Sequence, residues 1–185
     1  LSGASQEIIK LAEIASIPVT WTLLGSGGVP ASHPLNMGMM GMHGEYAVNN
    51  AIQEADLLIA CGMRFDDRVT GDVSTYSLNS KKIHIDIDPS EMNKIIPVDV
   101  GIVCDLKNTV AELLPLINKK SNKDWFEIIK KWQSESKSRD IINTKTETLF
   151  GAQVIRDIWE ETNGDAIIVS DVGQHQMLEA QYYDH

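Results

Sequence analysis

Short apolar segments alternate with helical segments through most of this chain. Residues 57–61 and 100–104 form apolar runs, and residues 82–88 alternate between apolar and polar side chains. Apolar residues also recur at helical spacing over 8–15, where Ser5 is the expected helix cap, and over about 44–55. Strands that are apolar throughout are typical of parallel sheets that helices cover on both faces. The sequence therefore predicts an α/β fold built on a parallel sheet.

The second half of the chain indicates a change of domain. Residues 118–123 are polar, a mostly polar helix is expected over about 125–138, and residues 139–148 have the composition of a linker. Beyond them, a helix, a strand at 166–170 and a second helix from about 174 indicate the beginning of another α/β domain. We therefore expect three parts, namely 1–120, 121–148 and 149–185.

Composition and charge exclude some functions. The chain has 185 residues and a formal net charge of −10, which argues against duplex nucleic acid and anionic membranes as partners. No apolar run approaches the roughly 18 residues of a membrane-spanning helix. Cys61 and Cys104 each follow apolar residues, so we expect two buried free thiols in a reducing, cytoplasmic compartment. The chain begins without methionine and ends at His185 inside a helical pattern, so we expect a fragment of a longer protein.

Residues 40–44 (MGMHG) form the first candidate binding segment. In parallel α/β sheets, ligands bind where strands end and loops enter helices, and this segment directly precedes a predicted helix. Its glycines allow close approach of the backbone, and a helix N-terminus offers free amides to a phosphate or carbonyl. A tight turn with inward-packed methionines is the alternative, and the spacing does not decide between them.

Residues 62–71 (GMRFDDRVTG) form the second candidate, directly after the apolar run 57–61. Arg64 and Arg68 could hold phosphates or a carboxylate through paired N–H donors. Phe65 could pack against a flat ring. A surface loop whose charges neutralise one another is the alternative, but its position at a strand end favours binding.

Two further segments occupy similar positions. In 84–88 (HIDID), Asp86 could accept hydrogen bonds from ribose hydroxyls, whereas Asp88 fits a turn cap, as Asp105 fits a helix cap. In 170–176 (SDVGQHQ), free amides together with Gln174 and His175 could hold a diphosphate, although the spacing alone favours an ordinary strand-to-helix turn.

Common catalytic and nucleotide-binding motifs are absent from the sequence. There is no GxGxxG, Walker loop, GxSxG, HExxH or paired CxxC. The extended run 19–24 leads into the glycine-rich residues 25–28, but their spacing is too loose for such a motif. The sequence therefore predicts no metal site and no catalytic residue in this chain.

Taken in order, the four segments resemble the acetolactate synthase large-subunit family of thiamine-diphosphate enzymes. RFDDRVTG at 64–71 is the most specific match, supported by GMHG at 41–44, HIDID at 84–88 and DVGQHQM at 171–177. The resemblance implies that 1–120 is most of a Rossmann-like central FAD domain without its first strand. It implies that 121–148 is the connecting segment and that 149–185 begins the C-terminal diphosphate-binding domain.

The resemblance also implies site residues. The residues implied to contact FAD are Thr22, Leu23, Leu24, Met40, Gly41, Met42, His43, Gly44, Gly62, Met63, Arg64, Phe65, Asp66, Arg68, Val69, Asp86, Ile87 and Asp105. Those implied to contact thiamine diphosphate are Val172, Gly173, Gln174 and His175. Arg68 would also hold the second keto acid.

The implied activity is the decarboxylation of pyruvate and its ligation to a second 2-keto acid, giving acetolactate or acetohydroxybutyrate. The implied cofactors are thiamine diphosphate, Mg²⁺ and FAD, and the implied partners are a homodimer or larger oligomer and a regulatory small subunit. The fragment alone is expected to be inactive. Two alternatives stay open: a central domain that serves another thiamine-diphosphate enzyme as scaffold or nucleotide site, and a nicotinamide-binding domain, which the missing GxGxxG disfavours.

Overall fold

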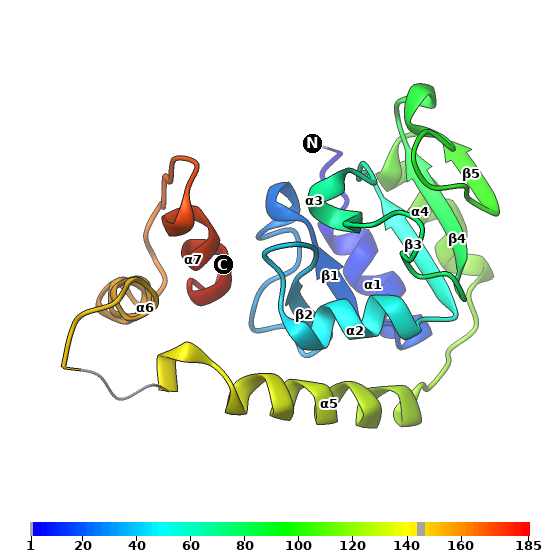
Figure 1. The fold of residues 1–185 in the computed structure, drawn as a ribbon. Coiled ribbons are helices and arrows are strands. Elements are labelled where there is room, and N and C mark those ends of the chain that lie inside the picture. The colour runs from blue at the N-terminus through cyan, green and yellow to red at the C-terminus, as the bar shows by residue number, and fades with distance from the viewer. Residues whose placement is uncertain (1, 144–146) are drawn as a thin grey trace.

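The computed structural model describes residues 2–143 and 147–185 and contains two parallel sheets (Figure 1). The first pairs β1 (Val19–Trp21) with β2 (Asn36–Met39). The second has the order β3 (Leu57–Cys61), β4 (Lys81–Asp86), β5 (Val100–Val103), with β4 central. The α/β class and parallel pairing are confirmed, although two sheets take the place of one continuous sheet.

Helices cover both faces of the strands (Figure 1). α1 packs against α4 behind the strands, and α2 lies in front and packs against α5. The bounds of these helices are α1 (Ser5–Ala15), α2 (Tyr46–Glu54), α4 (Leu106–Leu113) and α5 (Lys123–Ser138). Short helical turns form at α3 (Asp67–Thr70), η1 (Leu23–Gly25), η2 (Pro89–Glu91), η3 (Leu114–Leu116) and η4 (Ile141–Asn143).

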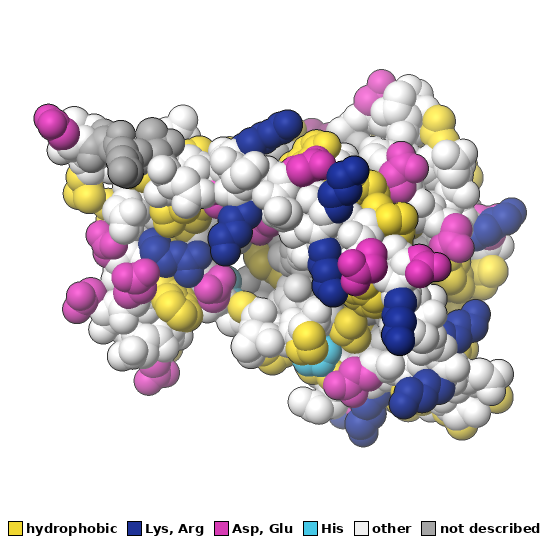
Figure 2. Space-filling view, turned by 90° about the horizontal axis from the view of Figure 1, so that it is seen from below, with side chains coloured by type: hydrophobic (Ala, Val, Ile, Leu, Met, Phe, Trp, Pro, Cys, Tyr) yellow, Lys and Arg dark blue, Asp and Glu magenta, His cyan; other side chains and the backbone are white. Residues whose placement is uncertain are grey.

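The main hydrophobic core joins α2, the strands and α5. Val48 on α2 is completely buried in this core, and Ile129 attaches α5 to it. Ile85 on β4 is also completely buried. Burial of each such side chain contributes about 1.5–3 kcal/mol. The outward side of α5 is polar, and Figure 2 shows Lys and Arg side chains interspersed with Asp and Glu on the face seen from below. As predicted, α5 is therefore a helix with one narrow apolar side.

The C-terminal segment lies beside β2. It contains α6 (Gly151–Thr162) and α7 (Gln174–Tyr182), which pack against each other, and α7 contacts β2. The Gln181 amide donates to the His43 carbonyl at 2.7 Å, and the Ala31 amide donates to the His185 carbonyl at 2.8 Å. Within the described residues, no helix is long and apolar enough to cross a membrane.

Four local predictions are wrong. Residues 166–170 form no strand, and Ile167 and Val169 are 95% and 90% exposed, because a strand requires a hydrogen-bonding neighbour that the described residues do not supply. The strand predicted over 19–24 ends at Trp21. α1 begins at Ser5 itself, so Ser5 is not its cap. Cys104 is exposed because it follows β5, which is an edge strand.

Candidate functional site

The loop after β3, residues 62–71, is called the arginine loop here. The chain leaves the sheet at Gly62, whose amide still donates to the Ile85 carbonyl of β4 at 2.8 Å. Gly62 has a φ of +60°, a left-handed conformation that glycine adopts without the cost of a β-carbon. The turn therefore directs the next residues over the carboxyl ends of β3 and β4.

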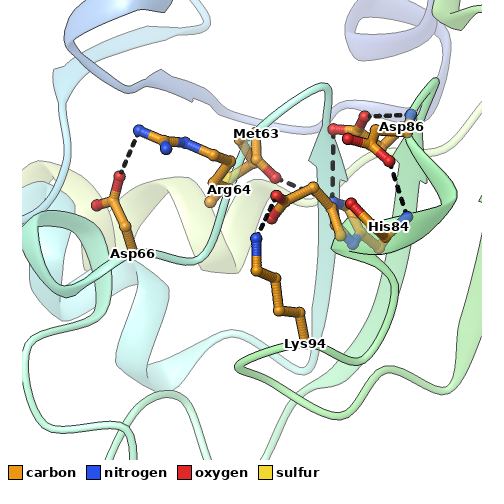
Figure 3. Close-up of polar contacts among 9 residues, drawn as sticks. Met63, Arg64, Asp66, His84, Asp86 and Lys94 are labelled. Carbon is orange, nitrogen blue, oxygen red and sulfur yellow. Dashed lines mark hydrogen bonds and ion pairs between the residues drawn. The ribbon is translucent and has the colours of Figure 1, made fainter.

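The two arginines of this loop have different surroundings. Arg64 Nη2 lies 3.3 Å from Asp66 Oδ2, and the Arg64 side chain is 66% exposed (Figure 3). Asp66 also caps α3 by accepting the Arg68 amide at 3.1 Å. Arg68 is exposed and, among the described residues, has no carboxylate partner; its guanidinium lies 3.7 Å from Met42 Sδ. The loop is therefore only partly self-neutralised, and Arg68 has its charge available for an anion.

Phe65 occupies the core instead of the surface. Its side chain is 4% exposed and packs edge-on against Tyr76 and His84, at centroid distances of 6.2 and 5.1 Å. The expectation that the Phe65 ring packs against a flat ligand is therefore wrong, because its apolar ring is already buried by protein.

The end of β4 supplies the neighbouring polar groups (Figure 3). His84 is 1% exposed, and its Nε2 lies 2.9 Å from the Met63 carbonyl oxygen and 3.9 Å from Asp86 Oδ2. Asp86 is 9% exposed and accepts the Asp88 amide at 2.8 Å. The next side chain, Ile87, is 70% exposed. The arginine loop and the β4 end are thus joined through His84.

Residues 40–44 are called the methionine loop here, and they contact the arginine loop directly. The Met42 amide donates to the Arg68 carbonyl at 2.7 Å. Gly41 has a φ of +91°, and a β-carbon there would overlap the Arg68 carbonyl oxygen; at Gly44 it would overlap the backbone of Met40. Met42 points outward and is 57% exposed, whereas Met40 is buried. The structure thus brings the first three candidate segments together.

The other predicted residues belong to separate elements of the structure. Leu24 in η1 is 94% exposed. Asp105 caps α4 by accepting the Asn108 amide at 3.1 Å, and Asp88 caps η2. Both therefore have the capping role that the sequence favours for them. Residues 171–173 lead into α7, whose first turn contains residues 174–176, and Val172 is 81% exposed.

The comparisons with known proteins identify the family. The family described as "Thiamine pyrophosphate enzyme, central domain" matches residues 1–113. The chain belongs to this thiamine pyrophosphate enzyme family.

Several curated proteins that resemble this thiamine pyrophosphate enzyme chain are acetolactate synthase large subunits. It is 42% identical to the acetolactate synthase large subunit of Buchnera aphidicola subsp. Schlechtendalia chinensis, over 98% of the chain and 33% of the relative. It is 36% identical to the isozyme 3 large subunit of Escherichia coli K12, over 98% and 33%. It is 42% identical to the large subunit of Lactococcus lactis, over 100% and 32%. The chain therefore spans about a third of the length of the curated relatives it matches.

One residue that supports the site of this thiamine pyrophosphate enzyme was missed in the sequence. The Asn49 side chain on α2 accepts the Gly41 amide and donates to the Gly41 carbonyl, both at 2.9 Å. An asparagine inside a predicted helix, eight residues after a glycine, is the only signal that the sequence offers. Such a polar side chain is unfavourable in a helix unless it serves a tertiary contact.

Proposed function

We propose that the whole protein is an acetolactate synthase, and that this chain supplies most of its FAD site and part of its thiamine diphosphate site. The observation that carries the proposal is the 36–42% identity to acetolactate synthase large subunits over 98% or more of this chain. The substrates would be pyruvate and a second 2-keto acid.

The surface around the arginine loop fits FAD in its chemistry. Leu24, Met42 and Ile87 are large apolar side chains with exposed fractions of 94%, 57% and 70%. Each belongs to a segment that the resemblance assigns to FAD, and exposed apolar side chains gathered on one surface would mark a place that a ligand covers. Arg68 adds an available guanidinium for a phosphate, and Gly62 has no neighbour within 4 Å of where a β-carbon would be. A flat apolar ring joined to a diphosphate requires this combination.

The FAD residues that we retain are those implied by the resemblance, with Phe65 contributing its backbone and not its ring. Arg64 and Arg68 would bind phosphate oxygens or orient the ligand, and the glycines at 41, 44 and 62 would permit close approach of the backbone. Arg68 would also pair with the carboxylate of the second keto acid. Asp86 would accept a hydroxyl through the carboxylate oxygen that Asp88 does not occupy.

Val172, Gly173, Gln174 and His175 would bind the diphosphate of thiamine diphosphate with the first amides of α7. That cofactor supplies the carbanion chemistry for the decarboxylation of pyruvate when bound. We propose Mg²⁺ as its companion in the whole enzyme. We also propose that 1–120 and 149–185 belong to separate domains joined by the connecting segment 121–148. The enzyme would be cytoplasmic and at least dimeric, and a regulatory small subunit would bind it.

The proposal is tested on the intact purified enzyme. We expect flavin absorbance in the preparation, and acetolactate formation from pyruvate that requires thiamine diphosphate and Mg²⁺. Arg68→Ala should lower acetolactate formation with little change in melting temperature. Lys130→Ala on the exposed side of α5 is the matched control, and it should leave both acetolactate formation and the melting temperature unchanged. A preparation without flavin and without acetolactate would overturn the proposal.

A further inference from the structure

His84 is a buried polar side chain that no cofactor contact explains. It is 1% exposed and lies near the end of β4, two residues before the strand ends at Asp86. Burying an imidazole costs free energy unless hydrogen bonds compensate it, and a leucine would fill such a position without that cost. The contacts of His84 therefore indicate why histidine is present.

His84 contacts both neighbours of Arg64, and Figure 3 shows its contact with Met63. The imidazole Nε2 lies 2.9 Å from the Met63 carbonyl oxygen, and the ring packs edge-on against Phe65 at 5.1 Å. A carbonyl oxygen only accepts, so Nε2 carries the proton and donates. Met63 precedes Arg64 and Phe65 follows it. With both flanking residues fixed, the Arg64 backbone has little freedom, and its side chain extends away from the core.

We propose that His84 is a positioning residue that fixes the direction of Arg64, so that the arginine loop is preorganised for the phosphate groups of FAD. This inference rests on the proposed function, because it assumes that FAD is the ligand. Preorganisation raises affinity, since the loop then loses less conformational freedom on binding. His84 itself need not touch the ligand.

The double substitution of His84 and Arg64 in the intact enzyme tests this role. His84→Leu removes the donor and keeps an apolar side chain of similar size, and we expect the Kd for FAD to rise about tenfold. Arg64→Ala should weaken FAD binding as well. If His84 acts through Arg64, adding His84→Leu to Arg64→Ala should change the Kd little further. Fully additive losses would overturn the proposal.

Restoring a donor provides the second test. The side-chain amide of His84→Gln can donate to the Met63 carbonyl, so we expect it to recover most of the FAD affinity. His84→Met, whose flexible side chain fills the space without a donor, should behave like His84→Leu. His84→Met therefore serves as the donor-free variant if His84→Leu does not fold. Equal FAD affinity in the wild type and the donor-free variants, or no recovery with glutamine, would overturn the proposal.

Ile85→Val is the matched control for lost stability. Ile85 is the next residue of β4 and is completely buried, and its backbone carbonyl accepts the Gly62 amide, a bond that the substitution leaves in place. We expect it to lower the melting temperature without changing the Kd for FAD. Amide hydrogen exchange should accelerate at Arg64 and Phe65 in His84→Met and stay slow in Ile85→Val. Absence of FAD binding in the wild type would contradict the proposed function, whereas an unaffected His84→Met would contradict only this inference.

Discussion

The Met42 amide donates a 2.7 Å hydrogen bond to the Arg68 carbonyl, which links the methionine loop to the arginine loop. Met42 lies just beyond β2, and Arg68 lies in α3 beyond β3, so the bond connects the ends of the two sheets. It also brings the Arg68 guanidinium to 3.7 Å from Met42 Sδ. The position of Arg68 therefore depends on the backbone of both loops.

Gly41→Ala should separate these two loops. A β-carbon at residue 41 would overlap the Arg68 carbonyl oxygen, and the φ of +91° is unfavourable for alanine. We expect a loss of about 2–4 kcal/mol in the free energy of unfolding, measured by urea denaturation. Gly27→Ala is the control, because Gly27 also has positive φ (+73°) but no neighbour within 4 Å. A Gly41→Ala loss no larger than that of Gly27→Ala would contradict the overlap.

Asn49→Ala should loosen the methionine loop from α2. The substitution removes a donor and an acceptor that together satisfy both backbone groups of Gly41. We expect a loss of about 1–3 kcal/mol in the free energy of unfolding and weaker FAD binding in titration. Asn50→Ala, one position later on the same helix, should change neither quantity by much. Similar losses with Asn49→Ala and Asn50→Ala would contradict a specific stabilising role for the hydrogen bonds to Gly41.

Lys82→Met should destabilise the turn that precedes β4. Lys82 is 8% exposed, and its ammonium donates to the carbonyls of Ser77 and Ser80 at 2.8 and 3.0 Å. Methionine would leave both carbonyls without that donor, at a cost of about 1–3 kcal/mol in thermal or urea unfolding. Lys94→Met, which removes a partly exposed ion pair with Glu91, should cost less than about 1 kcal/mol. A larger loss of stability in Lys94→Met than in Lys82→Met would contradict the proposed role of the Lys82 ammonium.

Stability should decrease in alkaline solution. Burial raises the pKa of the Cys61 thiol from 9.0 to about 12 and that of the Tyr76 hydroxyl from 10.0 to about 12. As pH rises above 9, the unfolded chain releases these protons before the folded chain does, so the free energy of unfolding falls. We expect a loss of roughly 1–2 kcal/mol at pH 10.

Cys61→Ala and thiol titration check this alkaline effect. Cys61→Ala should show a smaller fall in unfolding free energy between pH 8 and roughly pH 10 than the wild type does. In the folded protein at pH 8, the exposed Cys104 should react with an aromatic disulfide reagent and Cys61 should not. Cys104→Ser should remove the rapid reaction. Rapid reaction of Cys61 would contradict its raised pKa.

Local patterns in the sequence predicted most elements but not their partners. Residues 57–61 form β3 as expected, because an apolar run flanked by helices has few other stable environments. β2 was missed, since Asn36 and Gly38 lack the composition of a strand and depend on pairing with β1. Residues 166–170 have the right composition but no strand partner among the described residues, so the pattern alone was insufficient.

In the arginine loop, residues 62–71, the sequence likewise predicted some features and the tertiary structure decided others. Its sequence by itself determined the family resemblance, its place after a strand and the concentration of charge. Only the tertiary structure decided that Phe65 is buried against His84 and Tyr76, that Asp66 pairs with Arg64, and that Arg68 is left with its charge available. The physical reason is that periodicity records the direction of a side chain relative to its own strand or helix. Which protein groups then meet that side chain depends on residues distant in the chain.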